Sequence, residues 1–166
     1  MRHLQRLAAI ILAFMLLLSV PIPAQAASSS SISRSTADSE LIGKDFSGQN
    51  LQSEEFTNAK LDLTNFSKAD LRGAVFSGST LSQAKLHGAD FTYGIAYLVD
   101  FTGADLSDAV LEEAMLLRSN FTDVDITGAD FTNAILDRVQ VKKLCAVAKG
   151  VNSKTGVATR ESLGCK

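Results

Sequence analysis

The feature that most constrains this chain is a large apolar residue at every fifth position. The series keeps its register over 21 positions, 18 of which are Leu or Phe. Its members, here called centres, are Leu41, Phe46, Leu51, Phe56, Leu61, Phe66, Leu71, Phe76, Leu81, Leu86, Phe91, Ala96, Phe101, Leu106, Leu111, Leu116, Phe121, Ile126, Phe131, Leu136 and Val141. Because helices repeat every 3.6 residues and strands every 2, a period of five requires a turn at a fixed interval.

A small residue precedes most centres by two positions. Examples are Ala59, Ala69, Ala74, Ala84, Ala89, Ala104, Ala109, Ala114, Ala129 and Ala134. One large and one small inward residue, with three outward polar residues, predict a flat-sided solenoid. Its coils would stack about 4.8 Å apart with backbone hydrogen bonds between them. Each buried Leu or Phe would contribute roughly 1.5–3 kcal/mol.

The repeated triplet Ala-(Asp/Asn)-(Leu/Phe) occurs at residues 69–71, 89–91, 104–106 and 129–131. This pattern resembles the pentapeptide-repeat family over about residues 39–143. The resemblance implies an all-β solenoid, namely a right-handed quadrilateral β-helix with four repeats to a coil and about five coils.

A second period, of 20 residues, concerns the position just before a centre. Val75, Ile95, Met115 and Ile135 are apolar there and are separated by four repeats, which predicts that they lie one above another on one outer side. Tyr97 and Leu117 fall on the same side, with Leu98 at its edge. We call these seven residues the apolar face.

Three interpretations of the apolar face remain open at this stage. The β-branched residues suit extended backbone, or a terminal segment covers the face. A contiguous exposed apolar patch also commonly marks a binding surface for a protein partner.

Two departures from the repeat predict irregular coils. Lys44, Gln49 and Glu54 occupy the small inward position, so the first coil is expected to be atypical. Ala96 replaces a large centre, which predicts a less filled or distorted coil there.

The N-terminus resembles a secretory signal peptide. Arg2 and Arg6 precede an uncharged apolar run of 14 residues, 7–20, and an Ala-Gln-Ala cleavage pattern at 24–26. The alternative, a membrane anchor, requires about 20 apolar residues. We therefore expect export to an oxidising compartment, with no membrane insertion after cleavage.

The resulting organisation has four parts. Residues 1–26 form the signal peptide, 27–40 a flexible Ser-rich tether, 41–143 the β-helix and 144–166 a helical C-terminal cap. Removing residues 1–26 leaves 14 Lys and Arg against 18 Asp and Glu, a net charge of −4. This balance gives no reason to expect nucleic-acid binding.

The cap is predicted from helical spacing of Val141, Leu144, Cys145 and Ala148. A second short helix is expected over residues 159–163, with Thr159 as its N-cap. A helical cap would cover the apolar columns at the open end of a solenoid.

Cys145 and Cys165 are an even pair in an exported chain, which favours a disulfide. Closing a loop of about 20 residues would contribute about 3 kcal/mol. A metal site and redox-active thiols are the alternatives. The segment from Leu144 to Cys165 also resembles the cap of pentapeptide-repeat proteins of the cyanobacterial and chloroplast thylakoid lumen.

No catalytic, cofactor-binding or metal-binding residues are predicted. His87, the only His beyond the leader, takes an outward position, and the repeat accounts for the many Ser and Asp residues. We therefore expect a non-catalytic, exported protein-interaction scaffold with an unidentified protein partner. The alternatives are a DNA-mimicking protein that binds topoisomerase, as in cytosolic members of the family, and a redox-responsive lumenal protein that uses Cys145 and Cys165.

Overall fold

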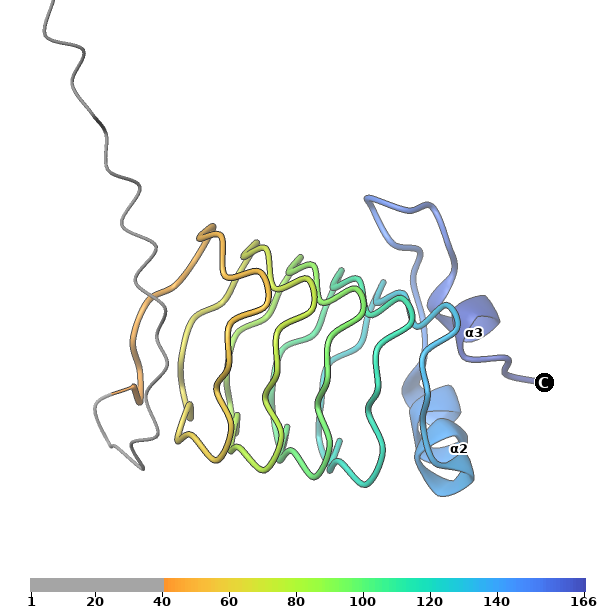
Figure 1. Ribbon diagram of the computed structural model, residues 1–166. Helices are drawn as coiled ribbons and strands as arrows, with labels where there is room; N and C mark the ends of the chain where they lie inside the picture. The colour runs from red at the N-terminus through yellow and green to blue at the C-terminus, as the bar shows by residue number, and fades with distance from the viewer. Residues whose placement is uncertain (1–40) are drawn as a thin grey trace, which may run out of the picture. The chain divides into compact units, whose positions relative to one another are not determined.

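The computed structural model describes residues 41–166. The predicted signal peptide, 1–26, and tether, 27–40, lie outside the described residues. The described chain consists of a β-solenoid followed by two helices, as Figure 1 shows.

Each five-residue repeat is a four-residue turn followed by one extended residue. The turn closes on the centre, as where the Ala74 N–H donates to the Leu71 carbonyl oxygen at 2.9 Å. The third residue of the turn has a φ between 54° and 73° at every fifth position from Gly43 to Asn133. A positive φ at this position favours Gly or Asn, which explains why Gly often follows a centre by two residues.

Parallel bridges connect residues that are 20 positions apart, from Asp45↔Asn65 to Met115↔Ile135. A bridging residue donates its N–H to the coil before it, and the next centre donates to the coil after it. Thus the Val75 N–H bonds to the Glu54 carbonyl oxygen at 2.9 Å, and that of Phe76 to the Ile95 carbonyl oxygen at 2.8 Å. The separation of 20 corresponds to four repeats per coil, as expected for the predicted solenoid.

The centres fill the interior. From Leu51 to Phe131, every centre other than Phe121 is at most 5% exposed. The small inward position is buried in every repeat from residue 59 to residue 129. Aromatic centres stack along the solenoid axis, with the Phe101 and Phe121 ring centroids 5.2 Å apart. Burial of the two inward positions in successive coils thus supplies one continuous core.

The coil that contains Ala96 is filled differently from its neighbours. The Phe91 ring packs against Gly94, where an added Cβ would lie only 2.5 Å from Phe91 Cδ2. The same ring contacts Phe76, with centroids 5.5 Å apart. Gly94 thus leaves room for the Phe91 ring, and a cavity of about 10 Å³ is lined by Phe91, Phe76 and Phe101 among others.

The first described coil differs from the others in the way the sequence predicted. Lys44 and Gln49, which stand at the small inward position, are exposed, and Glu54 is half-buried. Leu41 and Phe46 are only partly buried against the core.

Helix α2 spans Arg138–Val147 and packs Leu144 against the core. The predicted boundary of the repeats at residue 143, with Val141 as the last centre, is therefore wrong. The Asp137 N–H donates to Gln140 Oε1 at 2.8 Å, a capping interaction that starts a helix where the next turn would form.

Helix α3 spans Thr159–Ser162. Its N-cap is Ala158, so the prediction of Thr159 as the cap is wrong. Thr159 is instead the first helical residue and is fully buried. Within residues 41–166 no helix is long and apolar enough to cross a bilayer.

Candidate interaction face

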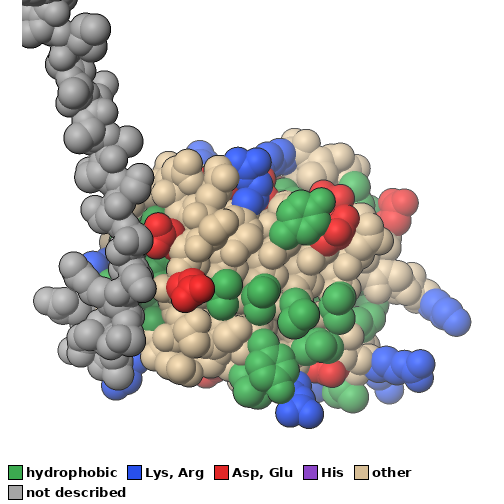
Figure 2. All heavy atoms as spheres, viewed as in Figure 1, with side chains coloured by type: hydrophobic (Ala, Val, Ile, Leu, Met, Phe, Trp, Pro, Cys, Tyr) green, Lys and Arg blue, Asp and Glu red, His purple; other side chains and the backbone are tan. Residues whose placement is uncertain are grey.

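The apolar face is built on one ladder of the solenoid. Val75, Ile95, Met115 and Ile135 are joined in sequence by parallel bridges, so their side chains lie one above another. Ile95 and Met115 are each 37% exposed and Ile135 is 50% exposed, whereas Val75 is half-buried. Figure 2 shows the resulting band of hydrophobic side chains across one side of the solenoid. The described C-terminal cap therefore leaves this ladder accessible.

We call the third residue of each turn, which has a positive φ, a corner. The coil of residues 81–100 widens the band from one corner to the next. Leu98 is 53% exposed at one corner, and Tyr93, at the preceding corner, is 60% exposed. Tyr97 and Leu117 are half-buried, and the Arg118 guanidinium lies 5.9 Å from the centroid of the Tyr97 ring. Tyr93 was not predicted from the sequence to border the face. The sequence feature that could have indicated Tyr93 is an aromatic residue at a corner position, where Gly is common.

The Asp residues before the centres stabilise turns. Asp100 Oδ1 accepts hydrogen bonds from the Thr102 hydroxyl at 2.6 Å and the Thr102 N–H at 3.1 Å. Asp125 makes the same pair of contacts with Thr127. These bonds hold the pKa of both carboxyl groups below their ordinary values. The recurring Asp and Thr pairs are thus explained by the architecture of the repeat.

Among residues 41–166, Asp70 has the carboxyl group whose pKa is lowered most. Arg72 Nε and Nη2 donate to its two carboxylate oxygens at 2.8 and 2.6 Å, and Gln52 Nε2 donates at 2.7 Å. The Arg72 bonds are the main reason that the pKa of Asp70 falls to about 2.

His87 lies on a polar side of the solenoid. Its Nδ1 is 2.9 Å from Ser107 Oγ, which in turn donates to Asp105 Oδ1 at 2.5 Å. The Asp105 carboxylate also accepts the Ser107 N–H, as other Asp residues of the repeats do. Among residues 41–166, no group of three His, Cys, Asp or Glu side chains is placed to hold a metal ion.

The loop between the two cap helices folds back along the solenoid. Asn152 is buried, and its Nδ2 lies 2.9–3.3 Å from the carbonyl oxygens of Asp108, Ala109 and Gly128. Lys154 Nζ reaches Asp90 at 2.6 Å. The cap is therefore fastened to several coils as well as to the last one.

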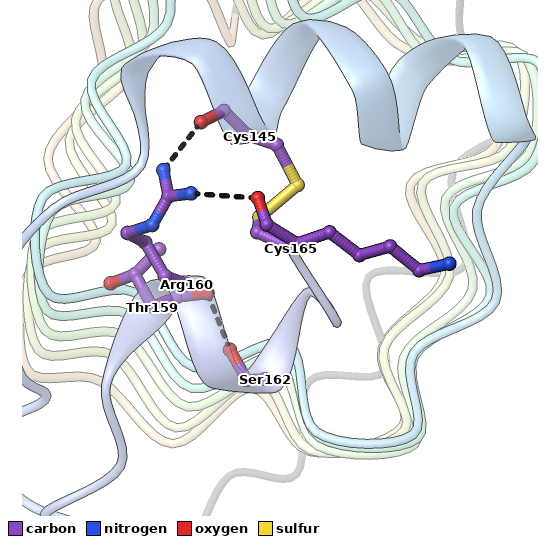
Figure 3. Close-up of a disulfide and its surroundings, with 6 residues drawn as sticks. Cys145, Thr159, Arg160, Ser162 and Cys165 are labelled. Atoms are coloured by element: carbon purple, nitrogen blue, oxygen red, sulfur yellow. Dashed lines mark hydrogen bonds between the residues drawn. A yellow bond between two sulfur atoms is a disulfide. The ribbon is translucent and has the colours of Figure 1, made fainter.

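Cys145 and Cys165 form a disulfide between α2 and the residues after α3, as Figure 3 shows. Arg160 adds a second connection. Its guanidinium donates to the carbonyl oxygens of Cys145 at 2.9 Å and Lys166 at 3.4 Å. The two cap helices are thus joined covalently and by hydrogen bonds.

These features define a capped β-solenoid with five-residue repeats. A family model described as Pentapeptide repeats matches residues 55–92 and 99–138 in eight copies. A pentapeptide repeat protein from the Arabidopsis thaliana thylakoid lumen is 38% identical, over 76% of this chain and 88% of that chain, with a TM-score of 0.49. The chain belongs to the pentapeptide-repeat family, as its Ala-Asp-Leu pattern predicted.

Two other solved structures are also similar. HetL, a pentapeptide repeat protein involved in heterocyst differentiation regulation in the cyanobacterium Nostoc, is 33% identical over 54% of this chain and 40% of its own, with a TM-score of 0.43. QnrB1, a plasmid-mediated fluoroquinolone resistance protein, is 20% identical over 64% of this chain and 89% of its own, with a TM-score of 0.30. No curated protein sequence matches the chain.

Proposed function

We propose that this protein is a non-catalytic scaffold of the thylakoid lumen or periplasm that binds a protein partner through the apolar face. The observation that carries the proposal is the exposed ladder of Ile95, Met115 and Ile135. Soluble domains rarely expose contiguous apolar side chains without using them for contact. Burial of these side chains against a partner would be favourable at about 25 cal/mol per Å² of apolar surface.

Three features support an exported location. Residues 1–26 have the sequence pattern of a secretory signal peptide, and disulfides persist in oxidising compartments. The similarity to a thylakoid lumen protein supports the same compartment.

The residues around the apolar face suggest the chemistry of the partner. Glu55 precedes Val75 in the same ladder, and Asp137 follows Ile135 by two residues. Glu113 occupies the same corner as Tyr93 in the next coil. A partner with apolar side chains at its centre and basic side chains at its rim would complement this arrangement.

Site-specific photo-crosslinking tests the proposal. A crosslinking residue at Leu98 should capture one partner, whereas one at Gln83, an exposed corner with the same backbone conformation, should not. The Ile95→Asp/Met115→Asp variant should abolish the Leu98 crosslink. The control variant Asn50→Asp/Lys60→Asp, at exposed bridging positions outside the apolar face, should retain it although it adds three negative charges in place of two. Equal capture from both corners would overturn the proposal.

Topoisomerase binding by DNA mimicry is the second candidate, because residues 41–137 contain 15 acidic and 6 basic side chains. A dense acidic surface is the property that such a mimic needs. Inhibition of gyrase supercoiling at low salt by the wild type and by the Ile95→Asp/Met115→Asp variant alike would favour this function. Absence of inhibition would exclude it.

A further inference from the structure

The two parts of the described chain carry opposite charge. The solenoid, residues 41–137, has a net charge of −9, whereas residues 138–166 hold seven basic side chains and one acidic side chain, a net charge of +6. The cap covers one end of the solenoid, as Figure 1 shows. The molecule is therefore an electric dipole along the solenoid axis, and its cap would face a negatively charged surface.

The outward side of α2 combines basic and apolar side chains. Leu144 is buried, while Val139 is 67% exposed and Val147 is 56% exposed. At 100° per residue, Val139 lies near the middle of the exposed side, between Lys142 and Lys143. Val147 lies on the other side of Lys143, about 80° from Val139. A basic helix side that also exposes apolar side chains is typical of helices that lie in the headgroup region of a bilayer.

Few of these cations are neutralised by the protein. Within the part of the chain that the structure describes, the ion pairs are Arg72–Asp70 and Lys154–Asp90. Arg138, Lys142 and Lys143 take part in neither, and all three are exposed. Their charge is thus available to an external anionic group.

We propose that the outward side of α2 binds the surface of an anionic lipid bilayer. Lysines would contact phosphate groups while Val139 and Val147 enter the headgroup layer, and no part of the chain would span the membrane. A lipid surface is favoured over an acidic protein because Val139 and Val147 are exposed on the same side of α2 as the lysines, where they gain from apolar contact. The dipole would turn the acidic solenoid away from the membrane and leave the apolar face accessible, so the inference is independent of the proposed protein partner.

Vesicle sedimentation of the exported protein tests this inference. It should bind phosphatidylcholine vesicles that contain one-third phosphatidylglycerol and not vesicles of phosphatidylcholine alone. Lys142→Glu/Lys143→Glu should weaken binding at least about tenfold. Lys68→Glu/Lys85→Glu makes the same charge change at exposed solenoid positions and should have little effect. Both variants keep the same N-terminal residues, so any lipid affinity of residues 27–40 is common to the two.

A second variant separates lipid from acidic protein. Val139→Ser/Val147→Ser should weaken binding to phosphatidylglycerol vesicles severalfold and leave adsorption to polyglutamate unchanged. Raising the salt to about 1 M, where the Debye length is about 3 Å, should release the wild type from vesicles. Failure to bind the anionic vesicles, or equal losses for the two lysine variants, would overturn the inference. Indifference of vesicle binding to the valine substitutions would indicate an acidic partner instead.

Discussion

The buried hydroxyl of Ser119 takes the place of a turn hydrogen bond at Val99. The Val99 N–H donates to Ser119 Oγ at 3.0 Å, and the Ser119 hydroxyl donates to the Ala96 carbonyl oxygen at 2.6 Å. In regular repeats the corresponding N–H bonds directly to the centre three residues earlier. One side chain thus connects two coils at the point where the small centre Ala96 interrupts the apolar series.

Ser119→Ala should lower the free energy of unfolding by about 1–3 kcal/mol, because the Val99 N–H would be buried without an acceptor. Ser79→Ala is the matched control. Ser79 makes the equivalent contact to the Ala59 N–H, which also bonds to the Phe56 carbonyl oxygen at 3.3 Å. Chemical denaturation should show the smaller loss for Ser79→Ala, and equal losses would contradict this account of Val99.

Asn152→Asp should detach the cap loop and destabilise the protein by at least about 2 kcal/mol. The carboxylate would still accept the N–H groups of Lys154 and Thr155. Its second oxygen, however, would replace the amide N–H donor and would face three backbone carbonyl oxygens without a hydrogen bond. Amide exchange of residues 150–158 should accelerate in this variant. Asn133→Asp, the same substitution at an exposed corner, should leave stability and exchange nearly unchanged.

The lowered carboxyl pKa values predict loss of stability in acid. A carboxyl group whose pKa is lower in the folded state stabilises the protein fully above the unfolded pKa and loses that contribution as pH falls through the folded value. For Asp70 the window runs from 3.8 down to about 2. Unfolding free energies should therefore fall from about pH 4 toward pH 2. In Arg72→Ala, the NMR titration midpoint of Asp70 should move toward 3.8. An unchanged midpoint would show that Arg72 is not the main cause of the lowered pKa of Asp70.

Removal of the disulfide should lower the unfolding free energy by about 3 kcal/mol, since Cys145 and Cys165 close a loop of about 20 residues. Cys145→Ser/Cys165→Ser should leave the solenoid folded, because Asn152 and Arg160 still hold the cap in place. Calorimetry measures the loss. If reduction of the wild type altered partner crosslinking at Leu98 without changing thermal stability, the bond would serve regulation in preference to structure.

The placement of the apolar face could be predicted from the sequence because it depends on register alone. Once the period of five and its multiple of 20 are recognised, Val75, Ile95, Met115 and Ile135 must share one ladder. Tyr93 was missed because the pattern assigns a corner to its position and does not show which side a corner side chain borders. The end of the repeats was misplaced because a capping interaction between Asp137 and Gln140 overrides the apolar periodicity.

The coiled architecture follows from the amino-acid pattern, because each repeat has the same local features: a centre, a small inward residue and a turn with positive φ. The same pattern predicted the family and the ladder of Val75, Ile95, Met115 and Ile135. Three features could be seen only in the folded chain: the packing of Phe91 against Gly94, the place where Asn152 fastens the cap, and the side of α2 that presents Lys142, Lys143 and Val139. These contacts depend on side chains that meet once, often far apart in sequence, and a repeating pattern carries no record of such single contacts.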